Sequence, residues 1–421
     1  MYKYLKIILC CLLLAPFAHA SSENFRTPAE FEVQDSLWVG WPTYDYIVGY
    51  STDDAVLNML EALTPHVKVN LVVQSQSAKQ QAAAKISQRN INTENLHYKI
   101  YPVAEFWLRD MGPVFMTGDQ GSKQMVDFNF NTWGVYNDSN PYALVEEKID
   151  RLIADDLGYN NIVTRLTGEG GNREFNGQGT LMLVEAVEMQ RNPNRSRAVL
   201  EQEYKRLFNV SKIIWLKQGL VEDPIANTVI PGPNGEAAYS FGTGGHIDEI
   251  ACFVNANTIL LAEITAAEAA SSELLAENRR RMEKNFQILK QARDQNGHAF
   301  TIIRIPAADV EYVTIDERDP IYWFLDDLVF GDNSEKGLPP GPAHYAPASS
   351  YLNFVITNNV VLAASYWQQG KPESTRLKDL RVVAALQQAF PNRAVVAANP
   401  IAINMGGGGM HCISAHEPSV F

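Results

Sequence analysis

Cysteine is scarce in this chain. Four cysteines occur among the 421 residues, and two of them, Cys10 and Cys11, lie within the first twenty positions. The remaining pair, Cys252 and Cys412, is too few for a disulfide framework, and a chain of this length can bury a large core without one. The two could pair with each other, but a cysteine that acts as a nucleophile has to stay free. We therefore expect no disulfide.

Basic residues are also in the minority. Lysine and arginine number 35 against 48 aspartates and glutamates, which gives a net charge of −13, spread along the chain. Such a chain repels polyanions, so we expect neither nucleic acid nor an anionic membrane as a partner. A small cationic substrate suits this charge, although an acidic surface that only maintains solubility explains it equally well.

Long apolar runs are missing as well. The run from Ile7 to Ala15 is too short to cross a bilayer comfortably. It follows Lys3 and Lys6 and precedes Ala18-His-Ala20, a small-x-small cleavage pattern that is typical of a signal peptide. We predict a signal peptide over residues 1–20, a single catalytic domain over residues 21–421, and a periplasmic or secreted location.

Strand patterns and helix patterns alternate along the chain. Strands are expected over residues 36–42, 67–73, 97–102, 179–185, 212–216, 301–305 and 394–397, and hairpins over 114–130, 242–262 and 350–364. Helices are expected over residues 53–63, 75–89, 144–156, 196–208, 267–296 and 377–390. This order recurs roughly every 70–80 residues and indicates an α/β fold. A doubly wound sheet and a closed array of repeats both fit it. Residues 315–348, rich in proline, glycine and aspartate, are expected to form a long loop at a rim or lid.

The stretch from Gly406 to Cys412 joins four consecutive glycines to a thiol. Glycine allows unusual backbone angles and the close approach of other groups. A thiol that follows such a loop, beside the imidazole of His411, is a candidate nucleophile. Taken alone, a flexible tail with an incidental cysteine explains the stretch equally well.

Four further polar clusters lie at expected strand ends or glycine turns, where α/β folds place their sites. They contain Asp110, Glu169, the pair His246 and Asp248, and Asn353. The pair is two residues apart and is expected on one face of a strand. Each cluster has a structural alternative, namely a turn cap, a solvated carboxylate, a satisfied core histidine or a loop hydrogen bond. The combination with a thiol favours a shared site.

A thiol, an imidazole and three carboxylates suit the chemistry of a guanidinium group. This group is a planar cation with five N–H donors, and two carboxylates can hold it by paired hydrogen bonds. Its central carbon is a poor electrophile because of delocalisation, so a strong nucleophile such as a thiolate is needed. A histidine can protonate the departing ammonia and then activate water. A third carboxylate can orient that histidine.

Seven motifs resemble those of agmatine deiminases and of the bacterial-type peptidylarginine deiminases, in the guanidino-modifying (pentein) superfamily. The motifs are Trp107-Leu-Arg-Asp-Met-Gly-Pro113, Val126-Asp-Phe-Asn-Phe-Asn-Thr-Trp-Gly134, Glu169-Gly-Gly171, Arg191-Asn-Pro-Asn-Arg195, Gly245-His-Ile-Asp248 with Ala251-Cys-Phe-Val254, Ser350-Tyr-Leu-Asn-Phe354 and Gly407-Gly-Gly-Met-His-Cys412. They occur in the family's order between about Pro28 and Pro418. The resemblance implies five pseudo-symmetric α/β modules closed around a central site, the five-module propeller of the pentein fold.

The resemblance also implies a role for each candidate residue. Cys412 would be the nucleophile and His246 the general acid and base, while Glu169 would support His246. Asp110 and Asp248 would bind the guanidinium. Trp107 would line the pocket and Asn353 would lie near it. No metal and no organic cofactor are implied; a homodimer is a candidate assembly.

The implied activity is hydrolysis of agmatine to N-carbamoylputrescine and ammonia, through a covalent amidino-thioether on cysteine. Deimination of peptidyl-arginine or free arginine outside the cytoplasm is the alternative, favoured by export, and a non-catalytic polyamine-binding protein is a third hypothesis. A cysteine peptidase fits poorly, because the papain-like order places the cysteine before the histidine. Residues 131–134 offer no arginine for a substrate carboxylate, although Arg173 is close to another motif in sequence.

Overall fold

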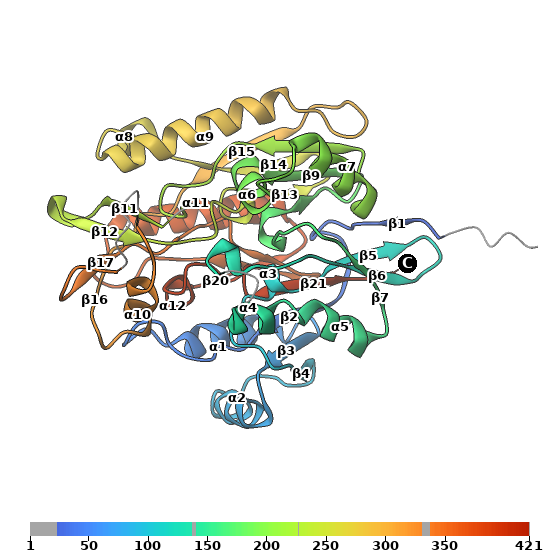
Figure 1. Ribbon diagram of the computed structural model, residues 1–421, viewed down its shortest axis with the longest axis horizontal. Coiled ribbons are helices and arrows are strands. Elements are labelled where there is room, and N and C mark those ends of the chain that lie inside the picture. Colours follow the sequence, from blue (N-terminus) through green and yellow to red (C-terminus); the bar gives the residue numbers. More distant parts are fainter. Residues whose placement is uncertain (1–22, 137–139, 226, 331–336, 421) are drawn as a thin grey trace, which may run out of the picture.

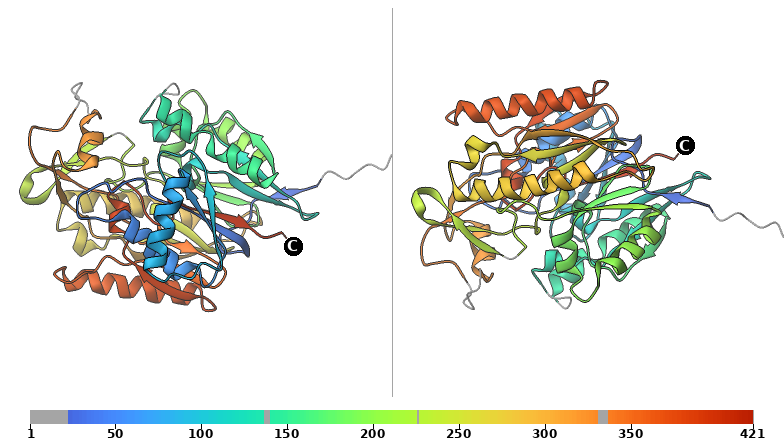
Figure 2. Two further views of the ribbon diagram at one scale, coloured as in Figure 1. Left: turned by 90° about the horizontal axis from the view of Figure 1, so that it is seen from below. Right: turned by 90° about the horizontal axis from the view of Figure 1, so that it is seen from above.

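Small sheets of three or four strands surround a common centre, and the longer helices lie on the outside (Figures 1 and 2). The computed structural model describes residues 23–136, 140–225, 227–330 and 337–420. Within these residues, no helix is both long enough and apolar enough to span a membrane. Residues 1–20 lie outside the described part of the chain, so the signal peptide and the extent of the domain that follows it stay predictions.

Five of the six sheets repeat one strand pattern, an antiparallel pair followed by a parallel strand. The first sheet joins the two ends of the chain and contains β21 (Ser414–Pro418), β2 (Gln34–Gly40) and β3 (Val69–Val73), extended by β4 (Leu96–Ile100). The second contains β5 (Val114–Gly118), β6 (Lys123–Asp127) and β7 (Asn160–Val163), with β1 (Phe25–Arg26) paired to β5. The other three are β8 (Glu174–Phe175), β9 (Thr180–Val184) and β10 (Lys212–Leu216); β13 (Ala251–Asn255), β14 (Thr258–Glu263) and β15 (Thr301–Pro306); and β18 (Val355–Ile356), β19 (Val360–Ala364) and β20 (Ala394–Ala398). This pattern confirms the predicted five-module α/β fold and excludes the doubly wound sheet.

Crossover helices join the parallel strands of each module. They are α1 (Thr52–Leu63), α2 (Gln76–Gln88), α4 (Pro141–Glu146), α5 (Ile149–Leu157), α6 (Glu185–Arg191), α7 (Arg197–Phe208), α8 (Ala266–Ala269), α9 (Glu273–Gln291) and α11 (Glu373–Ala389). The helical stretch expected over residues 267–296 is interrupted after Ala269 and ends at Gln291. Two helices occupy this stretch because the Ser272 side chain accepts a hydrogen bond from Leu275 N and caps a new helix start.

The sixth sheet comes from two insertions between modules. It contains β11 (Thr228–Pro231), β12 (Ala237–Ser240), β17 (Ala343–Tyr345) and β16 (Val313–Ile315). The short helix α10 (Pro320–Asp326) follows β16. The long loop predicted over residues 315–348 is therefore wrong in part, since a helix and β17 lie within it. Aromatic side chains stabilise this structure within the stretch, because the rings of the buried Tyr345 and the half-buried Phe324 pack on their neighbours.

The C-terminal strand closes the array. β21 pairs antiparallel with β2, so that Val39 is opposite Ser414, and it thereby completes the first module from the opposite end of the chain. A buried ion pair lies at this closure, with Lys123 Nζ 2.8 Å from Glu417 Oε1. Ser36 Oγ also donates to Glu417, at 2.6 Å. Burial opposes ionisation of Glu417, but the contacts with Lys123 and Ser36 outweigh it, and its pKa lies below the usual value.

We expect Glu417→Ala to lower the free energy of unfolding by about 2–3 kcal/mol, because the buried Lys123 ammonium loses its buried partner and keeps the exposed Asp35 as its ion-pair partner among the described residues. Urea unfolding followed by circular dichroism measures this change. Glu373→Ala, which breaks an exposed pair with Arg376, is the control and should not change the midpoint detectably. Equal midpoints for both variants would show that the closure does not depend on this pair.

Candidate active site

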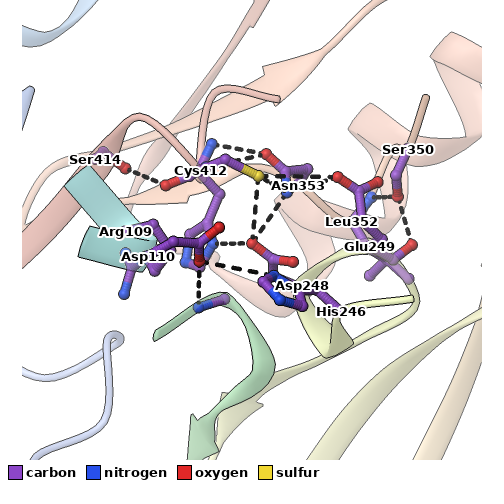
Figure 3. A network of polar contacts seen from close by, with 12 residues as sticks. Arg109, Asp110, His246, Asp248, Glu249, Ser350, Leu352, Asn353, Cys412 and Ser414 are labelled. Atoms are coloured by element: carbon purple, nitrogen blue, oxygen red, sulfur yellow. Dashed lines mark hydrogen bonds and ion pairs between the residues drawn. The ribbon is translucent and has the colours of Figure 1, made fainter. Parts of the chain in front are cut away.

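Each of the five modules contributes one segment to a central cluster, and each segment directly precedes the first strand of a module. The side chains are Asp110 in α3 (Leu108–Met111), Glu169 before β8, His246 and Asp248 before β13, Asn353 before β18 and Cys412 before β21. All six are buried. The structure thus brings these side chains together, and Figure 3 shows Asp110, His246, Asp248 and Asn353 around Cys412.

The Cys412 thiol lies among polar groups that are mostly acidic. Asn353 Nδ2 is 3.1 Å from Cys412 Sγ, and Asp248 Oδ2 and Glu249 Oε1 are 3.6 and 3.9 Å away (Figure 3). Burial raises the pKa of the thiol well above its usual value, and the charges of Asp248, Glu249 and Asp110 add to this shift. The sulfur is therefore a neutral thiol at neutral pH when nothing cationic lies beside it.

His246 lies between two carboxylates. Its Nδ1 is 3.6 Å from Asp110 Oδ1, and its Nε2 is 3.5 Å from Glu169 Oε2. Burial favours the neutral imidazole, but the charges of Asp110 and Glu169 outweigh burial and raise the pKa of His246 to about 9. The ring is consequently protonated at neutral pH and can act as an acid.

The expectation that His246 and Asp248 share one face of a strand is wrong. Ile247–Glu249 form a single 3₁₀ turn, η4, and the strand β13 begins only at Ala251. The turn still brings both side chains to the centre. A buried carboxylate that the sequence did not suggest holds the preceding loop: Asp223 accepts hydrogen bonds from the backbone N–H groups of residues 243–246.

Three donors fix the carboxylates beside His246. Gly171 N donates to Asp110 Oδ1 at 2.9 Å, Trp133 Nε1 donates to Asp110 Oδ2 at 2.8 Å, and Arg191 Nε donates to Glu169 Oε1 at 2.6 Å. Trp133 has a φ of 57°, an unfavourable backbone conformation for a tryptophan. Trp133 and Arg191 belong to the motifs at 126–134 and 191–195, but the sequence alone does not indicate that they hold these carboxylates.

A second histidine, His411, contacts Asp248 and holds it in place. His411 Nδ1 is 2.8 Å from Asp248 Oδ2, and its Nε2 is 2.9 Å from Glu30 Oε2. Glu30 also pairs with Arg109, at 2.6 Å. Burial and the Arg109 charge oppose protonation of His411, but Glu30 and Asp248 prevail and raise its pKa to about 9. Nothing in the sequence indicates Glu30, because it lies 381 positions from His411.

The glycine run passes close to the walls of the site. A side chain at Gly406 would overlap Tyr46, one at Gly408 would overlap Trp107, and one at Gly409 would overlap Asn353. Gly407 differs from these three, because its φ of +95° favours glycine. The close approach of neighbouring side chains to the backbone explains most of the glycines in the run. The alternative of a flexible tail is excluded because residues 406–412 are buried.

Two adjoining cavities lead from the surface to the thiol. The inner one is lined by Cys412, Asp110 and Trp107 among others. The lining of the outer one includes neither Cys412 nor Asp110. Four residues line both cavities, namely Trp107, Trp133, Phe241 and Gly406. Trp107 therefore lines the pocket as predicted, and α10 supplies part of the rim through Ile321 and Phe324.

Aromatic rings form most of the outer cavity. Its lining contains Tyr44, Tyr46, Trp107, Trp133, Tyr136, Tyr142, Phe241 and Phe324. One carboxylate, Glu105, lies among them, and no lysine, arginine or histidine is found in this lining within the described residues. Arg173 lies in a different cavity, with its guanidinium carbon 3.7 Å from the ring centre of Phe128.

Two groups of side chains in the described residues have the spacing of metal ligands, Glu30 with His411 and His416, and Asp248 with Glu249 and Cys412. Cations and donors from the protein already engage both groups. Arg109 pairs with Glu30 in the first. His411 and the Asn353 amide contact Asp248 in the second.

Comparison with known proteins extends over nearly the whole chain. Residues 26–418 match the sequence profile of the Porphyromonas-type peptidyl-arginine deiminases. The agmatine deiminases of Pseudomonas aeruginosa and Pseudomonas syringae pv. tomato are each 26% identical to it, over 96% and 95% of this chain and 98% and 97% of theirs. The structure of Enterococcus faecalis agmatine deiminase has the same fold, with a TM-score of 0.73 at 24% identity over 94% of this chain and 96% of that one.

We expect the His246 imidazole to titrate near pH 9 in nuclear magnetic resonance spectra of histidine-labelled protein. Glu169→Gln should lower this pKa, because it removes a negative charge that favours the protonated ring. An unfolded histidine titrates near about 6.5, so the stability that protonated His246 contributes is present below that pH and lost as the pH rises through about 9. Glu203→Gln on the surface is the matched control. Titration near pH 6.5 in the unsubstituted protein would contradict the account.

Proposed function

The chain belongs to the Porphyromonas-type peptidyl-arginine deiminase family, and on that basis we propose that it hydrolyses the guanidino group of agmatine to N-carbamoylputrescine and ammonia. One observation carries the proposal: a thiol, a histidine with a raised pKa and three carboxylates converge at the inner end of a pocket whose outer wall, within the described residues, contains no cation. The curated relatives named above are agmatine deiminases.

The guanidinium of the substrate binds between Asp110 and Asp248. Asp248 Oδ1 is buried and has no hydrogen-bond partner among the described residues, so it is free to accept from a substrate N–H. Asp110 is held by the Gly171 and Trp133 donors, and each of its oxygens keeps a lone pair for the substrate. Two carboxylates in fixed positions hold the planar cation in one orientation beside Cys412.

Binding of the cation also activates the thiol. The charges of Asp248, Glu249 and Asp110 contribute to the high pKa of Cys412. A guanidinium placed among them neutralises that field and favours the thiolate. The nucleophile therefore forms only when a cationic substrate is in place, which protects the resting sulfur from unrelated electrophiles.

The reaction then proceeds in two halves. The Cys412 thiol loses its proton to solvent as the guanidinium binds, and the resulting thiolate attacks the central guanidinium carbon and forms a C–S bond. Protonated His246 gives its proton to one nitrogen, which leaves as ammonia when the C–N bond breaks, and the carbon stays on sulfur as an amidino-thioether. Neutral His246 next takes a proton from water, the hydroxyl adds to the same carbon, and the C–S bond breaks to release the ureido product and the thiol. Glu169, held by Arg191, steadies the charged ring throughout.

The outer wall favours agmatine over arginine. Free arginine carries a carboxylate next to its amine, and an arginine in a peptide carries amide groups there. Among the residues that the structure describes, the lining of the outer cavity offers neither an arginine nor a lysine to a carboxylate, and Arg173 lies in a different cavity. Glu105 repels a carboxylate. A polyamine-binding protein would not need a nucleophile, so the intact cysteine and histidine favour catalysis over that third hypothesis.

We predict that the purified protein releases ammonia from agmatine with a kcat/KM about a hundredfold or more above that for arginine or a peptide ending in arginine, because Glu105 opposes a carboxylate. Cys412→Ala should reduce this activity by several orders of magnitude. Cys252→Ala is the matched control: this cysteine is also buried but lines neither cavity, and its removal should leave the activity intact. A preference for arginine, or an active Cys412→Ala variant, would refute the proposal.

The activity is proposed to operate outside the cytoplasm. The basic start, the apolar run and the Ala18-His-Ala20 tripeptide support export of the chain. Expression in a Gram-negative host should yield periplasmic protein whose first residue is Ser21, as read by N-terminal sequencing. Protein that keeps Met1 and stays in the cytoplasm would contradict this assignment.

A further inference from the structure

Glu105 is a buried carboxylate on the wall of the outer cavity. It is 6% exposed, and it lies two residues before Trp107, which lines both cavities. Tyr44 OH donates to its Oε1 at 2.5 Å, and Tyr46 OH donates to its Oε2 at 2.6 Å. The two phenols thus hold the carboxylate in one orientation at the edge of the cavity.

The partners of Glu105 differ from those of the carboxylates in the inner site. Glu169 pairs with Arg191, and Asp248 pairs with His411. Glu105 has only phenolic hydroxyls as side-chain partners, and no arginine, lysine or histidine interacts with it in the part of the chain that is described. Burial without a cation disfavours its ionised form and raises the pKa of the group. A cation that enters the cavity would relieve this penalty.

We propose that Glu105 is the anchor for a second positive charge on the substrate, a primary ammonium at the end remote from the guanidino group. The proposal rests on the proposed function and deepens it. It makes Glu105 a specificity-determining residue for ligands that carry a guanidinium at one end of an aliphatic chain and an ammonium at the other. The ammonium donates to the carboxylate, while the aliphatic chain passes between the rings of Trp107 and Phe241 that join the two cavities.

The aromatic lining strengthens the case for a cation. The Tyr44 and Tyr46 rings lie 4.9 Å apart between their centres, and Tyr46 lies 6.2 Å from Trp107. The faces of such rings attract an ammonium through their quadrupoles, and this attraction grows when water is excluded. A neutral alkyl end would bury itself against the same rings but would leave Glu105 without a charged partner.

A purely structural role for Glu105 has to be distinguished from this one. Its contacts with Tyr44 and Tyr46 also tie residues 44–46 to the segment before α3, and their loss could distort the pocket. Glu105→Gln keeps the size and one of the two acceptor oxygens of the side chain but removes its charge. A structural defect would weaken every guanidino ligand alike, whereas loss of an anchor weakens only those with a second positive charge.

The test compares agmatine with butylguanidine, which has the same guanidino group but no distal amine. Calorimetry with the Cys412→Ala protein measures binding without turnover. In that background, Glu105→Gln should weaken agmatine binding roughly 10- to 100-fold and leave butylguanidine binding unchanged. Glu147→Gln removes the same charge from a residue that lines neither cavity, and it should alter neither affinity.

In the active enzyme the same substitution should raise KM for agmatine and change kcat little. An equal loss for both ligands, or no loss for either, would overturn the anchor while leaving the deiminase activity standing. If the Cys412→Ala protein binds agmatine in a manner that depends on Glu105, but the unsubstituted protein releases no ammonia from it, the proposed function fails and the anchor stands. If agmatine does not bind at all, both fail.

Discussion

The central constraint on this molecule is the burial of several carboxylates around one sulfur atom. Asp110, Glu169, Asp248 and Glu249 are all nearly inaccessible, and uncompensated charges in such a place are costly. Arg191 neutralises Glu169, while protonated His411 and His246 offset the aspartates, and burial raises the pKa of Glu249 well above its usual value. The negative charge that remains keeps the thiol protonated until a substrate cation binds. Neutralisation of the carboxylates by the guanidinium thus links substrate binding to formation of the thiolate.

The repeated fold allows this cluster to form without burying long stretches of irregular backbone. Each module places the segment before its first strand at the centre, so one or two side chains per module converge without any long buried loop. Closure by β21 sets the last of these segments, with Cys412, beside the first four. The two insertions that form β11, β12, β16, β17 and α10 lie outside this repeat, and α10 contributes Ile321 and Phe324 to the lining of the outer cavity. The segment before β5 serves both purposes, because it supplies Asp110 to the centre and Glu105 to the outer cavity.

The sequence predicts the modules well, because the strand and helix patterns are local, and the ordered motifs indicate which side chains meet at the centre. The family match confirms the resemblance on which the roles were based. Residues that act through distant partners could not be found in this way. Glu30 supports His411 across 381 positions, Asp223 holds the loop before His246, and neither belongs to a motif. Glu105 lies beside a motif, but its position on the cavity wall is evident from the structure, where Tyr44 and Tyr46 of another segment donate to it.

Labelling with 2-chloroacetamidine and with its neutral isostere 2-chloroacetamide tests most directly whether Cys412 is a nucleophile activated by a bound cation. We expect the amidine to modify Cys412 selectively and much faster than the amide does, as followed by peptide mass spectrometry. Activity should be lost in step with this modification, and agmatine should slow it. Equal rates for the two reagents would contradict the link between cation and thiolate. Loss of activity while Cys412 remains unmodified would contradict its role as the nucleophile.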